Sequence, residues 1–313
     1  MKALVTGVAG FIGSHLAERL VTDGATVVGI DSFTDFYPRA IKERNLSVLR
    51  NATAFSLVES TLADADLPTL LDGVTHVFHL AAQAGVRKSW GQNFRVYTAN
   101  NVDATQALLE ACIGRPIERL VYASSSSVYG DAVALPMRED AHLRPVSPYG
   151  VTKLAAEQLC YLYNVSYAVP TVALRLFTVY GPRQRPDMGF SRFLRAAARG
   201  DAVRQFGDGR QTRDFTFVAD AVAAMVAASE HGRPGGVYNV GGGSRMELLA
   251  VFDLIRRVTG QPMRVEQIDA KPGDMRDTYA DTTRARMDLA FAPDTTLEDG
   301  LRAQYEWMAG AHD

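Results

Sequence analysis

The sequence of 313 residues contains only two cysteines, Cys112 and Cys160, which lie too far apart for a metal-binding cluster or a disulfide framework. We expect buried thiols in a reducing compartment, and therefore a cytoplasmic protein. No run reaches the ~18 uninterrupted apolar residues of a membrane span. Neither sign of charge dominates, since 33 Lys and Arg oppose 35 Asp and Glu for a formal net charge of −2. This balance gives no reason to expect nucleic acid or a membrane as partner.

Short apolar runs alternate with helical segments through the first half of the chain. Strands are expected at 3–5, 26–30, 53–58, 76–80, 120–124 and 171–176, and helices at 13–22, 102–112 and 149–163. Apolar strands that alternate with helices are typical of a parallel sheet covered on both faces. The length allows one large domain or two moderate ones. We therefore predict an α/β fold with a doubly wound parallel sheet.

Glycine and proline become more frequent after residue 176. They break the rest of the chain into shorter pieces, with helices expected at 190–199, 219–229 and 247–259. This pattern predicts a smaller C-terminal α/β lobe packed over the end of the sheet. We expect the first domain to span 1–176 and the second 177–313, with some later segments crossing back to the first.

A glycine-rich turn follows the first expected strand and opens the first expected helix. Its glycines are spaced G-x-x-G-x-x-G: Gly7, Gly10 and Gly13. This spacing brings backbone N–H groups to a pyrophosphate and packs the helix closely on the strand. Asp31 ends the second strand, where a carboxylate binds the adenosine ribose hydroxyls and repels a 2′-phosphate. We therefore predict a Rossmann-type domain that binds NAD. Basic residues downstream leave NADP as an alternative: Arg39, Lys42 and Arg44.

Tyr149 and Lys153 stand four residues apart at the start of an expected helix, so both side chains lie on one face. An ammonium close to a phenol favours the phenolate and lowers its pKa from about 10 towards neutrality. Such a tyrosine can accept a proton from an alcohol as hydride leaves the same carbon. Four serines at 124–127, at the end of a strand, supply hydroxyls that can share this proton. The pattern predicts a proton relay, although the same spacing also occurs on ordinary solvated helices.

In this order, the glycine turn, Asp31, the serine run and the Tyr149/Lys153 pair resemble the extended short-chain dehydrogenase/reductase family. Within it, the match is to the NAD-dependent nucleotide-sugar epimerases and dehydratases. The resemblance implies tightly held, recycled NAD, with Tyr149 as base, Lys153 as cofactor ligand and Ser125 as hydroxyl partner. It also implies further cofactor contacts: Phe11, Ile12, Leu80, Ala81, Ala82 and Asn100. Thr61 departs from the family pattern, which has a carboxylate near the adenine there, and has no assigned role.

Ser126 and Ser127 narrow the reaction. Dehydratases of the family place an Asp-Glu pair at these positions to expel water, so the serines argue against dehydration and join the catalytic set. The segment 176–188 is similar to that of UDP-glucuronate 4-epimerases, with Thr178 where UDP-glucose epimerases commonly carry Asn. The resemblance therefore implies a UDP-sugar substrate bound by the C-terminal lobe.

Arg185 is the residue that we expect to bind a sugar carboxylate, because its planar guanidinium can do so with two hydrogen bonds. The alternative is a loop arginine held by a neighbouring acid such as Asp187. Thr178 and further cations complete the expected substrate contacts: Arg87, Arg192, Arg213, Lys271 and Arg276.

The expected function is reversible C4 epimerisation of UDP-glucuronate to UDP-galacturonate. Tyr149 would take the C4 hydroxyl proton as hydride passes to NAD, and the 4-keto sugar would rotate before hydride returns to its other face. Because 4-keto-glucuronate is a β-keto acid that loses carbon dioxide easily, a UDP-glucuronate decarboxylase is an alternative. A UDP-glucose 4-epimerase is another. The intact Tyr149/Lys153 pair argues against a catalytically silent NAD-binding protein.

The resemblance also implies a homodimer formed through the helices expected at 102–112 and 149–163. We expect no metal site. His76 and His79 have metal-like spacing, but an extended strand places them on opposite faces.

Overall fold

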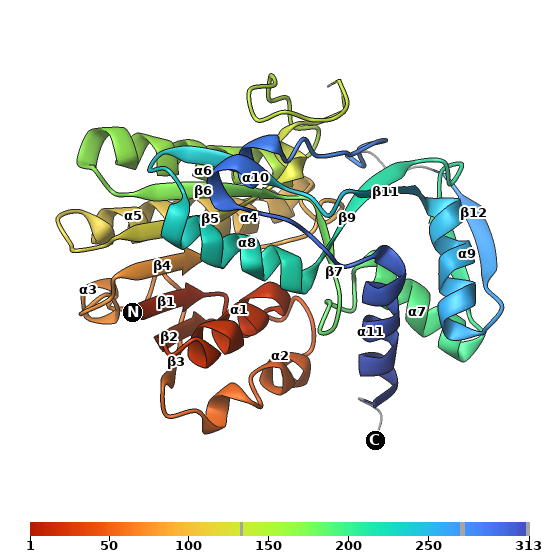
Figure 1. Cartoon of the computed structure of the whole chain (residues 1–313), viewed down its shortest axis with the longest axis horizontal. Coiled ribbons are helices and arrows are strands. Elements are labelled where there is room, and N and C mark those ends of the chain that lie inside the picture. The colour runs from red at the N-terminus through yellow and green to blue at the C-terminus, as the bar shows by residue number, and fades with distance from the viewer. Residues whose placement is uncertain (132–133, 270–272, 311–313) are drawn as a thin grey trace.

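The computed structural model describes residues 1–131, 134–269 and 273–310. Its centre is a seven-stranded parallel sheet in the order β10-β6-β5-β4-β1-β2-β3 (Figure 1). The strands are β1 (Lys2–Thr6), β2 (Thr26–Asp31), β3 (Phe55–Glu59), β4 (His76–His79), β5 (Arg119–Ser125), β6 (Thr171–Leu176) and β10 (Gly236–Val240). The α/β prediction is confirmed.

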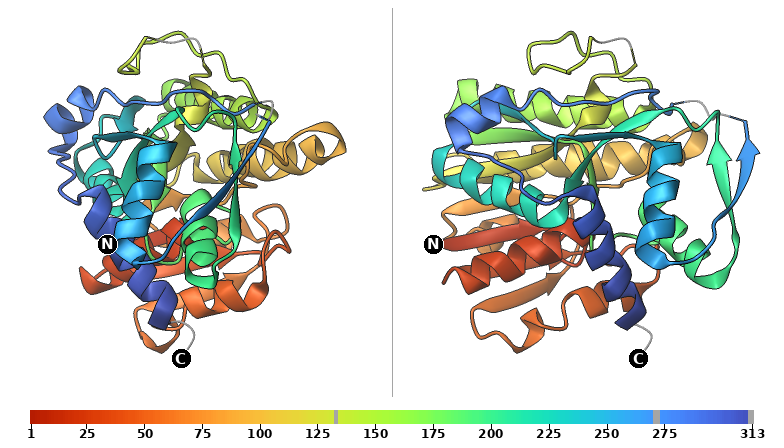
Figure 2. Two further views of the ribbon diagram at one scale, coloured as in Figure 1. Left: turned by 90° about the vertical axis from the view of Figure 1, so that its right-hand side faces the viewer. Right: turned by 45° about the vertical axis from the view of Figure 1, so that its right-hand side comes forward.

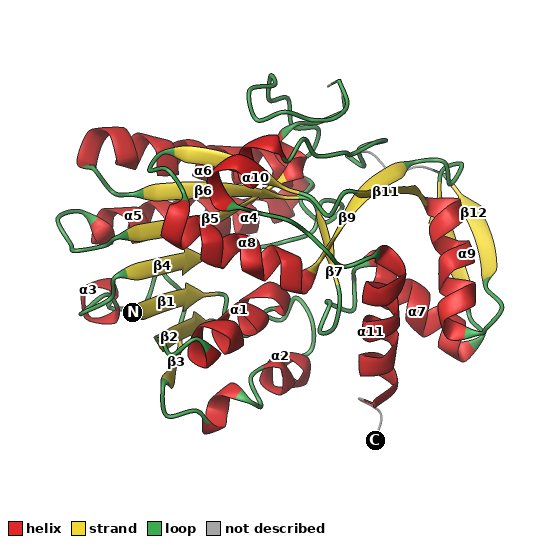
Figure 3. Ribbon diagram, viewed as in Figure 1, coloured by secondary structure: helices red, strands yellow, loops and turns green. Residues whose placement is uncertain are grey.

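Helices cover both faces of this sheet (Figure 3). On one face lie α1 (Phe11–Thr22), α2 (Arg39–Asn45), α8 (Val218–His231) and α10 (Thr283–Leu289). On the other lie α3 (Leu67–Leu70), α4 (Phe94–Thr98), α5 (Ala104–Cys112) and α6 (Pro148–Tyr167). Alternate residues of each strand enter opposite cores, so Ala3 and Val5 pack on the α1 side while Leu4 packs on the α5 side.

A smaller lobe stands beside the carboxyl ends of the strands (Figure 2). It contains a three-stranded sheet, β11-β9-β7, and a two-stranded parallel sheet, β12-β8. These strands are β7 (Thr178–Tyr180), β8 (Ala202–Phe206), β9 (Thr212–Phe217), β11 (Ser244–Glu247) and β12 (Arg264–Ile268). Its helices are α7 (Gly189–Arg199), α9 (Leu248–Thr259) and α11 (Leu297–Gly310), which share a separate apolar core.

The two lobes do not divide the chain into two continuous segments. The helices α8 and α10 and the strand β10 lie after residue 177, yet they pack on or within the central sheet. The boundary between residues 176 and 177 stays a prediction. The elements α8, β10 and α10 are later segments that cross back to the first domain. Within the described residues, no helix is long and apolar enough to cross a membrane.

One expected helix differs in its form. The segment expected at 102–112 begins with a π-helical turn, Ala99–Asp103, and continues as the regular α5. Asn101 explains the irregular turn, because its buried amide side chain bonds Gln83 and Thr152 on neighbouring segments. Apolar periodicity does not reveal such a side-chain constraint.

Candidate active site

A cavity of about 500 Å³ opens at the carboxyl ends of the central strands. Ligands of doubly wound sheets bind at this edge. The lining includes every residue predicted to contact the cofactor: Gly7, Gly10, Phe11, Ile12, Gly13, Asp31, Leu80, Ala81, Ala82, Asn100, Tyr149 and Lys153. The serine run, Thr178, Arg185 and Arg213 line the same cavity, so the structure brings these groups together.

The glycine turn leaves room for backbone alone. Gly7 has a φ of +69°, and a Cβ there would lie 2.9 Å from the backbone nitrogen of Ala81. A Cβ on Gly13 would lie 2.3 Å from the carbonyl oxygen of Gly7. The helix α1 begins after Gly10 with no side-chain cap and no acid in its first turn. Its free N–H groups therefore fit the pyrophosphate of a dinucleotide.

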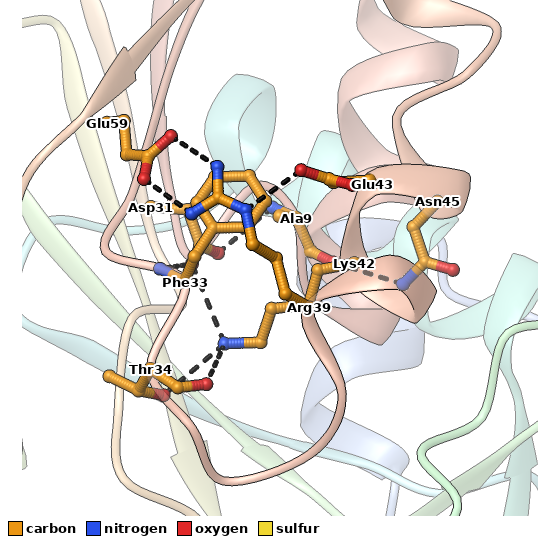
Figure 4. Close-up of polar contacts among 9 residues, drawn as sticks. All are labelled: Ala9, Asp31, Phe33, Thr34, Arg39, Lys42, Glu43, Asn45 and Glu59. Carbon is orange, nitrogen blue, oxygen red and sulfur yellow. Dashed lines mark hydrogen bonds and ion pairs between the residues drawn. The ribbon is translucent and has the colours of Figure 1, made fainter.

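Asp31 is held by the backbone around it (Figure 4). Its Oδ2 accepts a hydrogen bond from Ala9 N at 3.0 Å, and its Oδ1 accepts one from Phe33 N at 2.8 Å. Burial raises the pKa of this carboxyl, and the two hydrogen bonds and the Lys42 charge oppose that rise. The geometry leaves lone pairs for ribose hydroxyls.

Lys42 is a cavity residue whose position the sequence analysis did not find. Its ammonium lies 4.0 Å from Asp31 and donates to the carbonyl oxygen of Thr34 at 2.9 Å. Burial lowers the pKa of Lys42, and the charge of Asp31 opposes this. The cation is thus an internal partner of Asp31. No spacing rule predicts this, because only the return of α2 over the sheet places the lysine there.

The predicted catalytic pair, Tyr149 and Lys153, lies at the start of α6. Ser147 caps this helix by accepting a hydrogen bond from Gly150 N at 3.1 Å, and Pro148 occupies its first turn. Lys153 is only 3% exposed, and its Nζ lies 4.4 Å from the ring centroid of Tyr122. Burial lowers the pKa of Lys153 to about 8.

The pKa of Tyr149 differs from the expectation. Burial raises it above 10, while a hydrogen bond with Ser125 and the positive charge of Arg185 oppose the rise. Lys153 was expected to lower this pKa, but its ammonium lies over the Tyr122 ring. In this structure Ser125 and Arg185 are therefore the groups that favour the phenolate.

The serine run closes the end of β5. Ser125 Oγ accepts a hydrogen bond from Ser127 N at 3.1 Å, which begins a short 3₁₀ turn, Ser126–Val128. Ser126 is buried, and both it and Ser127 line the cavity. Ser124 donates to the carboxylate of Glu157 on α6 at 2.5 Å, and this hydrogen bond fixes the first serine of the run.

Glu157 and Arg175 form a buried ion pair behind the catalytic residues. Their side chains are 1% and 4% exposed, and Arg175 binds both carboxylate oxygens, at 2.7 and 3.1 Å. Arg175 also donates to Tyr129 Oη at 2.9 Å, and Tyr129 donates to the side chain of Asn239. The sequence analysis missed this network. The only available signal was Glu157 one helical turn after Lys153.

His79 belongs to a second buried network. Thr6 Oγ1 accepts hydrogen bonds from the backbone of Leu80 and Ala81, which leaves its own proton for His79 Nδ1 at 2.8 Å. His79 Nε2 then donates to Thr105 Oγ1 at 2.9 Å, and Thr105 donates to the Asn101 carbonyl. Burial lowers the pKa of His79 to about 3, so the ring is neutral. Its role is to hold the loop that faces the glycine turn.

Arg185 reaches the cavity with a partner of its own. It donates to both oxygens of Asp187, each at 3.0 Å, and its guanidinium lies 5.6 Å from the ring centroid of Phe36. The alternative of an arginine held by Asp187 is thus observed, in a position that also faces the cavity. Arg213 donates to the carbonyl oxygens of Met275 and Arg276 at 2.6 and 2.9 Å.

Three other predicted cations lie away from the described lining. Arg87 pairs with Asp274 at 2.7 Å and stacks on a ring of the second lobe. Arg276 pairs with Asp208 at 3.1 Å, and Arg192 is exposed on α7. Lys271 lies outside the described residues. Because these arginine side chains are exposed, they can change their orientation. The spacing of charges in the sequence does not reveal which acids pair with them.

The fold and the cavity define a dinucleotide-binding enzyme with a Ser–Tyr–Lys relay suited to moving a proton from an alcohol. The model of the NAD dependent epimerase/dehydratase family matches residues 3–241, and the chain belongs to this family. The resemblance inferred from the motifs is confirmed, and the cofactor is NAD.

Relatives extend over the whole chain. It is 44% identical over 316 residues to the uncharacterized UDP-glucose epimerase YtcB of Bacillus subtilis, covering 100% of this chain and 99% of the relative. It is 35% identical to the UDP-glucuronate 4-epimerase of Thermodesulfobacterium geofontis, covering 97% and 95%. The crystal structure of UDP-glucuronic acid 4-epimerase from Bacillus cereus, in complex with UDP-glucuronic acid and NAD, superposes with a TM-score of 0.97. That enzyme shares 40% identity, with 99% and 100% of the two chains covered.

Proposed function

We propose that this chain is a UDP-glucuronate 4-epimerase, which interconverts UDP-glucuronate and UDP-galacturonate. The observation that carries the proposal is the position of Arg185, whose guanidinium lines the cavity that holds Tyr149 and acts on its pKa. A cation in the same cavity as the proposed base suits a sugar carboxylate next to the reacting carbon. The similarity to a structure that contains UDP-glucuronic acid supports the same substrate.

The chain's own groups move and hold the proton. Ser125 and Tyr149 share a hydrogen bond, so the two hydroxyls can bracket the C4 oxygen and Tyr149 can take its proton. Lys153 has a pKa of about 8, so at a pH below 8 its charged ammonium lies beneath the relay. NAD, when bound, accepts the C4 hydride and returns it. Inversion requires the keto sugar to turn between these two transfers.

The carboxylate of the keto sugar needs separate control. A 4-keto-glucuronate loses carbon dioxide once its carboxylate bond aligns with the carbonyl π system. Arg185 and Thr178 face the cavity from the second lobe, and the serines face it from β5. We propose that these groups keep the carboxylate out of that alignment until hydride returns.

A UDP-glucose 4-epimerase is the second candidate, and Asp187 is the observation that favours it. Because Asp187 already accepts hydrogen bonds from Arg185 Nε and Nη2, a neutral sugar would not leave the guanidinium without an acid. The relative YtcB carries that activity in its name.

The test is incubation of the purified protein with UDP-glucuronate and no added NAD, followed by mass spectrometry and proton NMR. We expect an isomer of unchanged mass with inverted C4, which also shows that the cofactor is carried and recycled. Loss of carbon dioxide would make the enzyme a decarboxylase. Turnover of UDP-glucose but not UDP-glucuronate, with or without added NAD, would support the second candidate.

We also propose a cytoplasmic homodimer. The helix α6 exposes apolar side chains along its length, including Val151, Leu162 and Val165 at 45%, 48% and 59%. Such a stripe on one helix is typical of a contact surface. We expect a dimeric mass in light scattering and a monomeric mass for Leu162→Glu/Val165→Glu. The buried thiols of Cys112 and Cys160 suit a reducing compartment, and cell fractionation tests the location.

A further inference from the structure

Arg39 opens α2 beside the Asp31 carboxylate (Figure 4). Its guanidinium lies 4.4 Å from the ring centroid of Phe33, the residue whose backbone N–H binds Asp31 at 2.8 Å. A cation therefore stands one side chain away from the carboxylate suited to the ribose. In NADP-binding domains an arginine near the end of the second strand accommodates the 2′-phosphate. Arg39 has the chemistry and the location for this role.

The donors of this arginine are already taken. Its two terminal nitrogens donate to the two oxygens of Glu59 at 2.6 and 2.7 Å, and its Nε donates to Glu43 at 2.8 Å. Glu59 ends β3 and is in register with Asp31 at the end of β2. Two carboxylates therefore stand side by side at this edge of the sheet. The effect reaches Asp31, because the charge of Glu59 adds to burial in raising its pKa.

We infer that Glu59, assisted by Glu43, occupies the hydrogen-bond donors of Arg39 and so prevents this arginine from binding a 2′-phosphate. Exclusion of NADP then depends on Glu59 as well as on Asp31. A 2′-phosphate at this place would have to displace a two-pronged ion pair and then face the released carboxylate. The other basic residues of the segment have partners of their own, and Lys42 already lies 4.0 Å from Asp31 as its partner. Lys42 donates to Thr34, and Arg44 lies 5.1 Å from the ring centroid of Trp307.

The test is a competition between the two nucleotides for the whole protein. Purified protein is equilibrated with equal concentrations of NAD and NADP, and the nucleotides that it retains are released and quantified by mass spectrometry. We expect Glu59→Gln to raise the bound NADP:NAD ratio about tenfold, the size of one charge-assisted hydrogen bond. Glu43→Gln, which loses a single contact, should raise it less.

Two further variants separate the causes. Glu59→Gln/Arg39→Gln should return the ratio to the wild-type value, because the phosphate acceptor is gone. Asp23→Asn frees Arg19 from a comparably exposed pair on α1 and should leave the ratio unchanged. A ratio for Glu59→Gln within twofold of wild type would overturn the inference. A tenfold gain that persists without Arg39 would overturn it as well, by assigning the gain to repulsion alone. The readout needs no sugar, so it is independent of the proposed epimerase activity.

Discussion

The floor and the rim of the cavity hold their polar groups in opposite ways. The floor, formed by Lys153, Ser124 and the Glu157–Arg175 pair, is buried; Ser124 and Arg175 both donate to Glu157, and the Lys153 ammonium lies over the Tyr122 ring. The rim consists of the outer cations, Arg185 in the lining and Arg87 and Arg276 outside it; all three are partly or well exposed and pair with acids of their own. An exposed pair with a single acid contributes only about 0–1 kcal/mol, so an incoming anion can replace that acid at small cost, unlike at Arg39, which two acids hold. The floor is thus arranged before substrate binds, and the rim can exchange its partners.

The largest effect is expected from removing the base above the floor. Tyr149→Phe keeps the ring, which packs against Tyr97, but removes the hydroxyl that takes the C4 proton. We expect kcat to fall about 10³-fold, equivalent to about 4 kcal/mol. Steady-state kinetics measures the loss of proton transfer, and the content of bound NAD shows separately whether the cofactor is still held. The matched control is Tyr161→Phe on the exposed side of α6, and a loss below tenfold for Tyr149→Phe would contradict the assignment.

The stability of the floor and of the rim can be compared directly. Glu157→Ala leaves Arg175 buried without its carboxylate and should lower the free energy of unfolding by about 3–5 kcal/mol. Asp274→Ala releases the exposed Arg87 and should cost at most about 1 kcal/mol. Denaturant unfolding measures both. The double replacement Glu157→Leu/Arg175→Met should recover most of the loss, since no buried charge is left unpaired. Equal losses for the two single variants would erase the distinction between floor and rim.

Arg185 tests whether the rim recognises the substrate. Arg185→Ala should raise KM for UDP-glucuronate about 10–100-fold, as expected for loss of charge-assisted hydrogen bonds. The KM for UDP-glucose should change little. Arg199→Ala, at the exposed end of α7, is the control. An unchanged KM for UDP-glucuronate, with unchanged turnover and product, would refute the role of Arg185.

The pH profile tests the charge of the lysine in the floor. Lys153 has a pKa lowered to about 8 by burial, so its ammonium is present below that pH and lost above it. Because the expected role of Lys153 as a cofactor ligand needs its charged form, kcat/KM should fall as pH rises through about 8, by about tenfold for each further unit. Measurement from pH 6 to 10 checks this. A profile that stays flat to pH 10 would show that the ammonium is not required.

Local patterns in the sequence were reliable where backbone geometry decides the outcome. The glycine turn, the end of β2 at Asp31 and the start of α6 at Tyr149 were predicted within two residues, because each follows from glycine, strand or cap chemistry. Long-range partners were not predictable. The burial of Lys42, the Glu157–Arg175 pair and the hold of Glu59 on Arg39 join segments that only the fold brings together.

The sequence by itself determined the parallel sheet and the nucleotide turn and predicted the relay residues, because periodicity and short motifs act over a few neighbouring positions. Only the tertiary structure decided which charged side chains are already paired or buried and which can bind a ligand. In the folded chain the Lys153 ammonium lies over the Tyr122 ring, Arg185 pairs with Asp187, and β10 joins the central sheet. The physical reason is that burial and ion pairing depend on distances between remote segments, and a linear sequence does not contain these distances.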